Sequence, residues 1–83
     1  MNNDIDARLQ DILRTHFANS TLSVTRETTP RDVRGWDSMA NVTLAVEIER
    51  SFGIRIRPAE MEAVRNVGDL ITLISRHLSP SLS

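Results

Sequence analysis

Cysteine, lysine and long apolar runs are all absent from this 83-residue sequence. The lack of cysteine excludes disulfides, thiolate metal sites and a catalytic cysteine. No apolar run approaches the roughly 18 residues that cross a bilayer, so we expect no membrane span. Residues 1–4 contain neither a basic stretch nor a long apolar run, which is unlike a secretory signal. We therefore expect a cytoplasmic protein.

The charge of the chain is nearly balanced. Ten basic side chains, all of them arginine, and eleven acidic ones give a formal net charge of −1, which disfavours a nucleic-acid binder. We find no paired carboxylates, metal-ligand cluster or glycine-rich phosphate loop, so we expect neither an enzyme nor a metal site. The length fits a single domain over 1–83, with a core at about 4–79 and a flexible tail at 80–83. We expect it to be a monomer.

Apolar residues recur at helical spacing along most of the chain, which predicts an all-α fold. We expect main helices at about 4–17, from 37 or 38 to 52, and from a capping-box sequence at 66–69 to 78, with one short helix at 58–64. Asn3 or Asp4 can cap the first helix, and Gly53 supplies a left-handed stop for the second. The expected core-facing residues are Ile5, Leu9, Ile12, Leu13, Phe17, Leu44, Ile48, Phe52, Val67, Leu70, Ile71, Ile74 and Leu78.

A long connection, residues 18–35, separates the first two helices. A loop of this length is unusual in a small domain and is often functional. We expect Leu22, Val24 and Val33 to hold it against the core. Thr29 and Pro30 can open one short helical turn, with threonine as the cap and proline in the first position. Residues 54–57 permit a brief strand, although no partner strand is predicted.

The segment Gly35-Trp36-Asp37-Ser38-Met39 places a serine in the first turn of a helix, directly after a flexible approach. Free backbone N–H groups and the helix dipole favour an anion there, so a phosphodiester on Ser38 would meet favourable electrostatics. Asp and Ser are also common helix caps, so the pattern by itself leaves a purely structural role open. We expect Trp36 to anchor the loop against the core rather than to bind a ligand.

The helix after Ser38 carries two apolar stripes when residues are placed at about 100° intervals. The first stripe should face the core and consists of Leu44, Ile48 and Phe52. The second lies nearer Ser38 and consists of Met39, Val42 and Val46. Because so short a chain can hardly bury both stripes, we interpret the second as an exposed docking patch. Burial of the helix on most sides is the alternative.

The segment GWDSMANVTLAVEIERSFGIRI resembles the acyl carrier proteins, whose signature is Asp-Ser-Leu at the head of the second helix. Met39 stands where leucine is usual, which is a volume-conserving change. The resemblance continues through the turn at 52–54 and the two later helices. It covers essentially the whole chain, with the first loop its weakest part, and it implies a four-helix acyl-carrier bundle.

The resemblance also implies a function. Ser38 would be the attachment point for 4′-phosphopantetheine, transferred from coenzyme A by a separate phosphopantetheinyl transferase. The thiol of that arm would carry acyl groups as thioesters to acyl-activating, acyl-transferring or condensing enzymes, and the domain itself would catalyse nothing. Asp37 matches the acidic residue before the serine, and Glu47 and Glu49 lie on the helix that partner enzymes read. The expected partner-facing residues are thus Asp37, Met39, Val42, Val46, Glu47 and Glu49.

The chain departs from the family pattern in its charge. Residues 37–62 contain five acidic and three basic side chains, whereas carriers of general fatty-acid synthesis are strongly acidic there. Electrostatic complementarity governs the choice of partner, so we hypothesise a carrier for a specialised lipid, polyketide-like or related pathway. An aminoacyl or peptidyl carrier and an unmodified helical interaction module stay open as alternatives. We expect structural or surface roles for His16 and His77.

Overall fold

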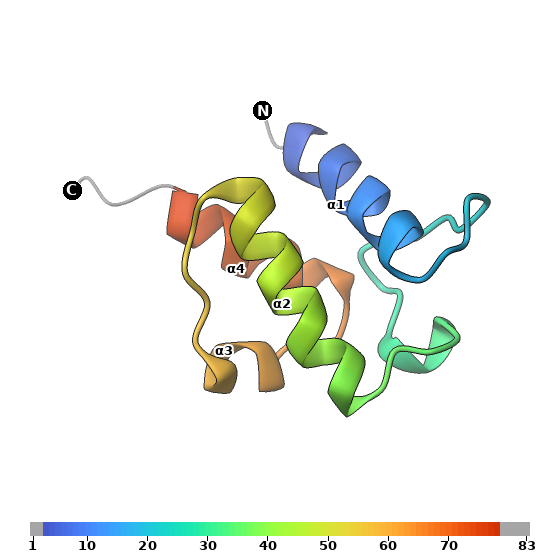
Figure 1. The fold of residues 1–83 in the computed structure, drawn as a ribbon. Helices are drawn as coiled ribbons and strands as arrows, with labels where there is room; N and C mark the ends of the chain where they lie inside the picture. The colour runs from blue at the N-terminus through green and yellow to red at the C-terminus, as the bar shows by residue number, and fades with distance from the viewer. Residues whose placement is uncertain (1–2, 79–83) are drawn as a thin grey trace.

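The computed structural model describes residues 3–78, with side chains from residue 5 onward, and its regular secondary structure is helical (Figure 1). The helices are α1 (Asn3–His16), α2 (Ser38–Phe52), α3 (Pro58–Glu62) and α4 (Val67–Leu78), and the 3-10 turn η1 covers Pro30–Asp32. No strand occurs among these described residues, so the brief strand considered at 54–57 does not form. The predicted all-α fold is confirmed. The cap expected from Asn3 or Asp4 and the tail at 80–83 lie outside the described side chains.

Two helices end earlier than the periodicity indicates. Ala18 has a left-handed backbone with φ 51°, and its N–H donates to Thr15 O at 3.2 Å while that of Asn19 donates to Arg14 O at 2.9 Å. This paired arrangement closes α1 at His16. The short helix predicted at 58–64 ends at Glu62. The Val64 N–H donates to Met61 O, only three residues earlier, so the chain after Glu62 forms a 3-10-type turn instead of a further α-helical turn.

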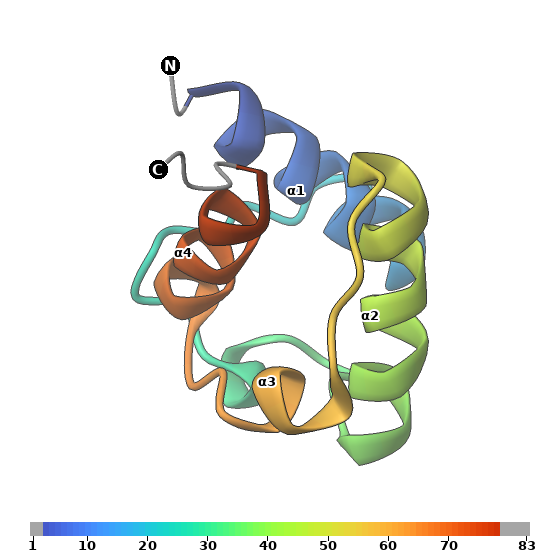
Figure 2. The ribbon, with the colours of Figure 1, turned by 90° about the vertical axis from the view of Figure 1, so that its left-hand side faces the viewer.

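Helix α1 packs against both α2 and α4, while α3 packs against α2. Figure 2 shows α2 and α4 on opposite sides of the bundle, with α3 across one end. The fully buried centre contains the predicted residues Leu9, Leu13, Leu44, Ile48, Leu70 and Ile74. Ile5, Ile12 and Phe17 lie at its margin, partly buried. These residues form the expected core.

One predicted core residue was wrong and three core residues were missed. Ile56 and Met61, in the segment that contains α3, are 6% and 2% exposed. The other two cases lie on α4. Leu78 lies in the last turn and is 43% exposed, whereas Leu73 is buried at 6% exposure. Leu73 shares a helix face with His77, four residues later, which contacts Glu60 of α3. Because α3 covers this face as well, α4 buries a wider apolar arc than a single stripe predicts.

The long loop is fastened to the helices by its backbone. Thr28 O and Arg26 O each accept a 2.8 Å hydrogen bond, from the N–H groups of Val67 and Gly68 at the start of α4. Val33 is buried, and Leu22 and Val24 are partly buried against the core, as predicted. η1 begins at Pro30 with Thr29 as its cap, also as predicted. The loop is thus a fixed layer that satisfies the first amides of α4.

The capping sequence before α4 forms with a shifted partner. Asn66 Oδ1 accepts from Asp69 N–H at 2.8 Å, as a cap should. The Asp69 carboxylate, however, accepts from the backbone N–H of Arg65 at 3.1 Å rather than from Asn66.

None of the described helices is long and apolar enough to cross a membrane.

Candidate functional site

The first turn of α2 presents Ser38 to solvent. Asp37 precedes the helix with an extended backbone, and its Oδ1 accepts from Ala40 N–H at 2.9 Å. Its carbonyl accepts the first helical hydrogen bond, from Asn41 N–H at 2.9 Å. Asp37 is therefore the cap, and Ser38 is the first helical residue. Because capping is done by Asp37, the exposed Ser38 side chain is not needed for that role.

The approach to Ser38 is a tight, anchored turn. Gly35 has φ 93°, a left-handed conformation that favours glycine. Trp36 is only 6% exposed, and its ring centroid lies 5.8 Å from that of Phe17. The predicted anchoring role of Trp36 is confirmed. The turn moves the chain from the buried indole to the exposed serine within two residues.

The arrangement fits a phosphodiester linked to Ser38. The serine stands at the positive end of a 15-residue helix, whose first amides have no intrahelical acceptor. Only one of those amides, Ala40 N–H, is occupied by the Asp37 side chain. An exposed hydroxyl at this position can carry a negatively charged group without burying it.

A groove of about 540 Å³ begins at Ser38 and runs between α2 and the segment that contains α3. We call it the α2–α3 groove. Its lining is mainly apolar, with polar groups at several positions along it. It is formed by Ser38, Asn41, Val42, Ala45, Val46, Glu49, Ile56, Pro58, Met61 and Glu62. A group attached at Ser38 would therefore have an apolar surface directly beside it.

The two stripes of α2 differ sharply in exposure. Leu44 and Ile48 are fully buried and Phe52 is 8% exposed, whereas the second stripe is open to solvent. In that stripe Met39, Val42 and Val46 are 77%, 65% and 43% exposed. Their exposure matches the sequence-based expectation, and their role as a docking patch stays a prediction.

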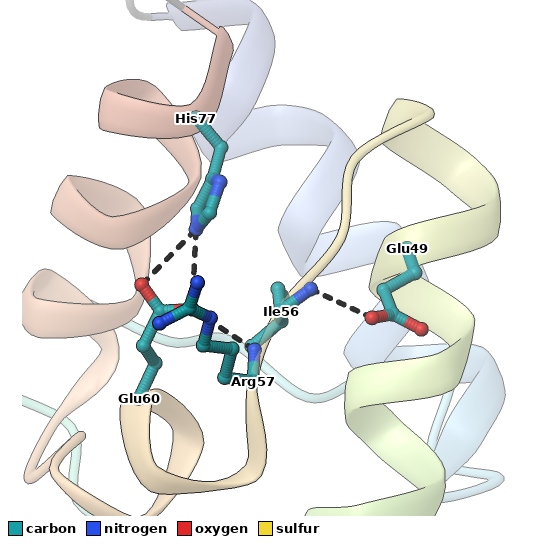
Figure 3. A network of polar contacts seen from close by, with 5 residues as sticks. All are labelled: Glu49, Ile56, Arg57, Glu60 and His77. Carbon is teal, nitrogen blue, oxygen red and sulfur yellow. Dashed lines mark hydrogen bonds and ion pairs between the residues drawn. The ribbon is translucent and has the colours of Figure 1, made fainter.

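The two glutamates expected to face partners lie in different surroundings. Glu47 is exposed. Glu49 is partly buried, and its carboxylate accepts from Ile56 N–H at 2.6 Å (Figure 3). That hydrogen bond joins the end of α2 to the chain entering α3. Glu49 therefore has a structural contact that the sequence did not indicate.

A second polar contact fastens α3 to α4. Glu60 accepts from Arg57 N–H at 2.9 Å, and its Oε2 lies 3.2 Å from His77 Nε2 (Figure 3). The Arg57 hydrogen bond, and to a lesser extent His77, lower the pKa of Glu60 despite partial desolvation. Between another pair of helices, His16 Nε2 of α1 lies 3.1 Å from Thr43 Oγ1 of α2. Both histidines thus link helices, in keeping with the structural roles expected for them.

Sequence reasoning missed Asn41. Its Oδ1 accepts from Trp36 Nε1 at 3.0 Å, and its Nδ2 donates to Met61 O at 3.3 Å. The available signal was weak: asparagine is a poor helix former and stands here within a helix, which often means that its amide has partners.

Within the described residues no group of three or more His, Cys, Asp or Glu side chains is arranged to hold a metal ion.

Comparisons with known proteins agree with this geometry. Residues 7–74 match the family model described as a phosphopantetheine attachment site. The chain is 33% identical over 76 residues to acyl carrier protein 2 of Ralstonia nicotianae, covering 92% of this chain and 94% of that relative. It is 28% identical over 75 residues to an acyl carrier protein of Thermotoga maritima, covering 90% and 93%.

A solved structure shows the same fold. The solution structure of a holo acyl carrier protein from Geobacter metallireducens superposes with a TM-score of 0.81 at 33% identity. The match covers 88% of this chain and 84% of that one. The bundle described above is therefore shared with a protein of similar length.

Proposed function

This chain belongs to the acyl carrier protein family, and we propose that Ser38 is the residue to which its 4′-phosphopantetheine prosthetic group is attached. As a member of that family it is a carrier protein and not an enzyme. One observation carries the assignment to Ser38. This serine is exposed at the first position of α2, with an independent cap before it and the α2–α3 groove beside it.

The chain's own residues have three tasks in this proposal. Asp37 fixes the start of the helix, Ser38 supplies the oxygen that bears the arm, and the first turn of α2 offsets the charge of the phosphodiester. When attached, the arm supplies a terminal thiol on which an acyl group is carried as a thioester. The apolar walls of the α2–α3 groove offer that acyl group a place away from water.

We further propose that the exposed stripe of Met39, Val42 and Val46 is where partner enzymes dock. Such a cluster beside the attachment serine is what an apolar docking surface requires, because exposed apolar side chains gain most from burial. The expected partners are a phosphopantetheinyl transferase and acyl-activating, acyl-transferring or condensing enzymes. The cytoplasmic location and monomeric state expected from the sequence stay predictions.

The charge balance around this surface supports a specialised pathway. Residues 37–62 carry five acidic side chains against three arginines, a net of −2. Enzymes that recognise a densely acidic carrier should therefore associate more slowly with this one. To test this, the acylated chain is offered to a housekeeping fatty-acid synthase. Slow turnover is expected, and efficient turnover would refute the specialised role.

The attachment site is tested by intact-mass measurement after incubation with coenzyme A and a phosphopantetheinyl transferase. The unaltered chain should gain one phosphopantetheine, and Ser38→Ala should gain none. Ser51→Ala is the matched control, because it removes a serine hydroxyl from the other end of the same helix. It should be modified like the unaltered chain. Labelling of Ser38→Ala would refute the assignment.

A further inference from the structure

Trp36, Asn41 and Met61 form a hydrogen-bonded chain across the attachment end of the molecule. The indole N–H of Trp36 donates to Asn41 Oδ1 at 3.0 Å, and Asn41 Nδ2 donates to the Met61 carbonyl at 3.3 Å. The indole only donates and the carbonyl only accepts, so the amide has one orientation that satisfies both. Asn41 is thereby held between two fixed groups.

The position of this chain relative to Ser38 gives it a functional meaning. Trp36 lies two residues before the serine and Asn41 three residues after it, while Met61 belongs to α3. Asn41, Met61 and Ser38 all line the α2–α3 groove. The Asn41 amide therefore joins the two walls of the groove at the end where the cargo would enter.

Helix α3 depends on such contacts for its place. It has five residues, too few for a helix that is stable alone. Its segment is fastened by Glu49 to the end of α2, by Glu60 to His77 on α4, and by Asn41 to the start of α2. Of these three contacts, the Asn41 contact belongs to the first turns of α2, beside Ser38. Its loss should loosen α3 there, while the other two contacts and the buried side chains of Ile56 and Met61 still hold the segment.

We propose that Asn41 is a positioning residue that holds the two walls of the α2–α3 groove together beside Ser38. It thereby shields the thioester of any carried acyl group that is long enough to enter the groove. This inference rests on the proposed function of Ser38. Trp36 contributes by fixing the Asn41 amide in the orientation that reaches Met61. An acetyl group is too short to benefit, whereas an octanoyl group extends into the apolar part of the groove.

The test measures release of acyl groups from the arm by hydroxylamine. Its nitrogen attacks the thioester carbonyl, the C–S bond breaks, and the sulfur leaves to take up a proton. For Asn41→Ala, octanoyl release should be about 2- to 10-fold faster than in the unaltered chain, the range expected for losing one hydrogen bond. Acetyl release should be unchanged. Equal octanoyl rates in the two proteins would overturn the inference.

Two further variants separate positioning from general loosening. Asn66→Ala also removes an amide hydrogen bond, but at the start of α4 and outside the groove, so octanoyl release should stay at the unaltered rate. If it accelerates as much as Asn41→Ala does, the effect is structural and the inference fails. Trp36→Phe keeps an aromatic ring but removes the N–H donor, and it should accelerate octanoyl release less than Asn41→Ala.

The double variant tests whether Trp36 acts through Asn41. Octanoyl release from the protein with both changes should be no faster than from Asn41→Ala alone, because the second change removes a bond already lost. Multiplied effects would refute the linkage. The two proposals fail differently: absence of transferase labelling would defeat the assignment of Ser38, whereas normal labelling with equal octanoyl rates would defeat only the role of Asn41.

Discussion

Replacing Asp37 by alanine should destabilise the chain, because its carboxylate caps the helix that presents Ser38. The cap hydrogen bond to Ala40 N–H is 2.9 Å long, and alanine leaves that amide to water. Loss of a capping side chain costs about 1 kcal/mol, and loss of a negative charge at the helix N-terminus adds about 0.3–1 kcal/mol. The free energy of unfolding should therefore fall by about 1–2 kcal/mol. For a chain of this size each kcal/mol lowers Tm by about 4–8 °C.

Two matched variants divide that loss between geometry and charge. Asp37→Asn keeps an oxygen that can accept from Ala40 N–H, so it should lose only the charge contribution, less than about 1 kcal/mol. Asp11→Ala removes an exposed carboxylate from the surface of α1 and should change stability by less than about 0.5 kcal/mol. The assay is urea unfolding followed by circular dichroism. The capping argument is refuted if Asp37→Ala is as stable as Asp11→Ala, or if Asp37→Asn is as unstable as Asp37→Ala.

Three other perturbations have defined outcomes, and urea unfolding measures each. Ala18→Gly should stabilise the chain by about 0.5 kcal/mol, because it relieves a left-handed alanine at φ 51° at some cost in unfolded-state entropy; a loss of stability would contradict this. Gly68→Ala should destabilise the chain by about 1 kcal/mol, because the added Cβ would lie 3.0 Å from Arg26 O. The same change at an unhindered helix position usually stabilises a protein. A gain in stability would show that the loop at Arg26 moves away at no cost. The hydrogen bond from the Arg57 N–H is the main reason that the pKa of Glu60 is lowered. The ionised carboxylate therefore stabilises the folded chain above its ordinary pKa of 4.5, and this contribution is lost as the pH falls below that value. Glu60→Gln should therefore lose less stability than the unaltered chain as the pH falls, and parallel pH profiles would argue against this.

Much of the fold was predictable because local sequence and packing agree. The periodic apolar residues of α1, α2 and α4 mark faces that the structure buries, and Gly53 ends α2 with φ 66° as predicted. The short turn at Pro30 also follows from local chemistry, since proline fits the first position and Thr29 precedes it. Each of these features depends on residues close together in sequence.

The features that were missed depend on contacts between distant segments. The burial of Leu73 requires α3 to lie against α4, and the hydrogen bond of Glu49 requires Ile56 to turn back toward α2. The contact of Asn41 with Met61 joins residues twenty positions apart. Helical periodicity describes one helix at a time, so it cannot indicate which polar side chains meet across the groove.

The sequence predicted that Ser38 lies at the start of a helix, but it did not predict which residues surround the serine. The Asp37-Ser38 pair indicated a helix start, and the structure shows that the aspartate alone provides the side-chain cap. The α2–α3 groove beside Ser38 is formed by residues from two segments, and its existence follows only from the folded arrangement. The site is therefore a local motif completed by tertiary packing.

The most direct test of the account is tandem mass spectrometry of peptides from the protein purified from the cells that produce it. We predict that the peptide containing Ser38 carries phosphopantetheine on that hydroxyl, in free or acylated form. A protein in which Ser38 is always unmodified, or in which the arm is attached to another residue, would contradict the assignment of the attachment site.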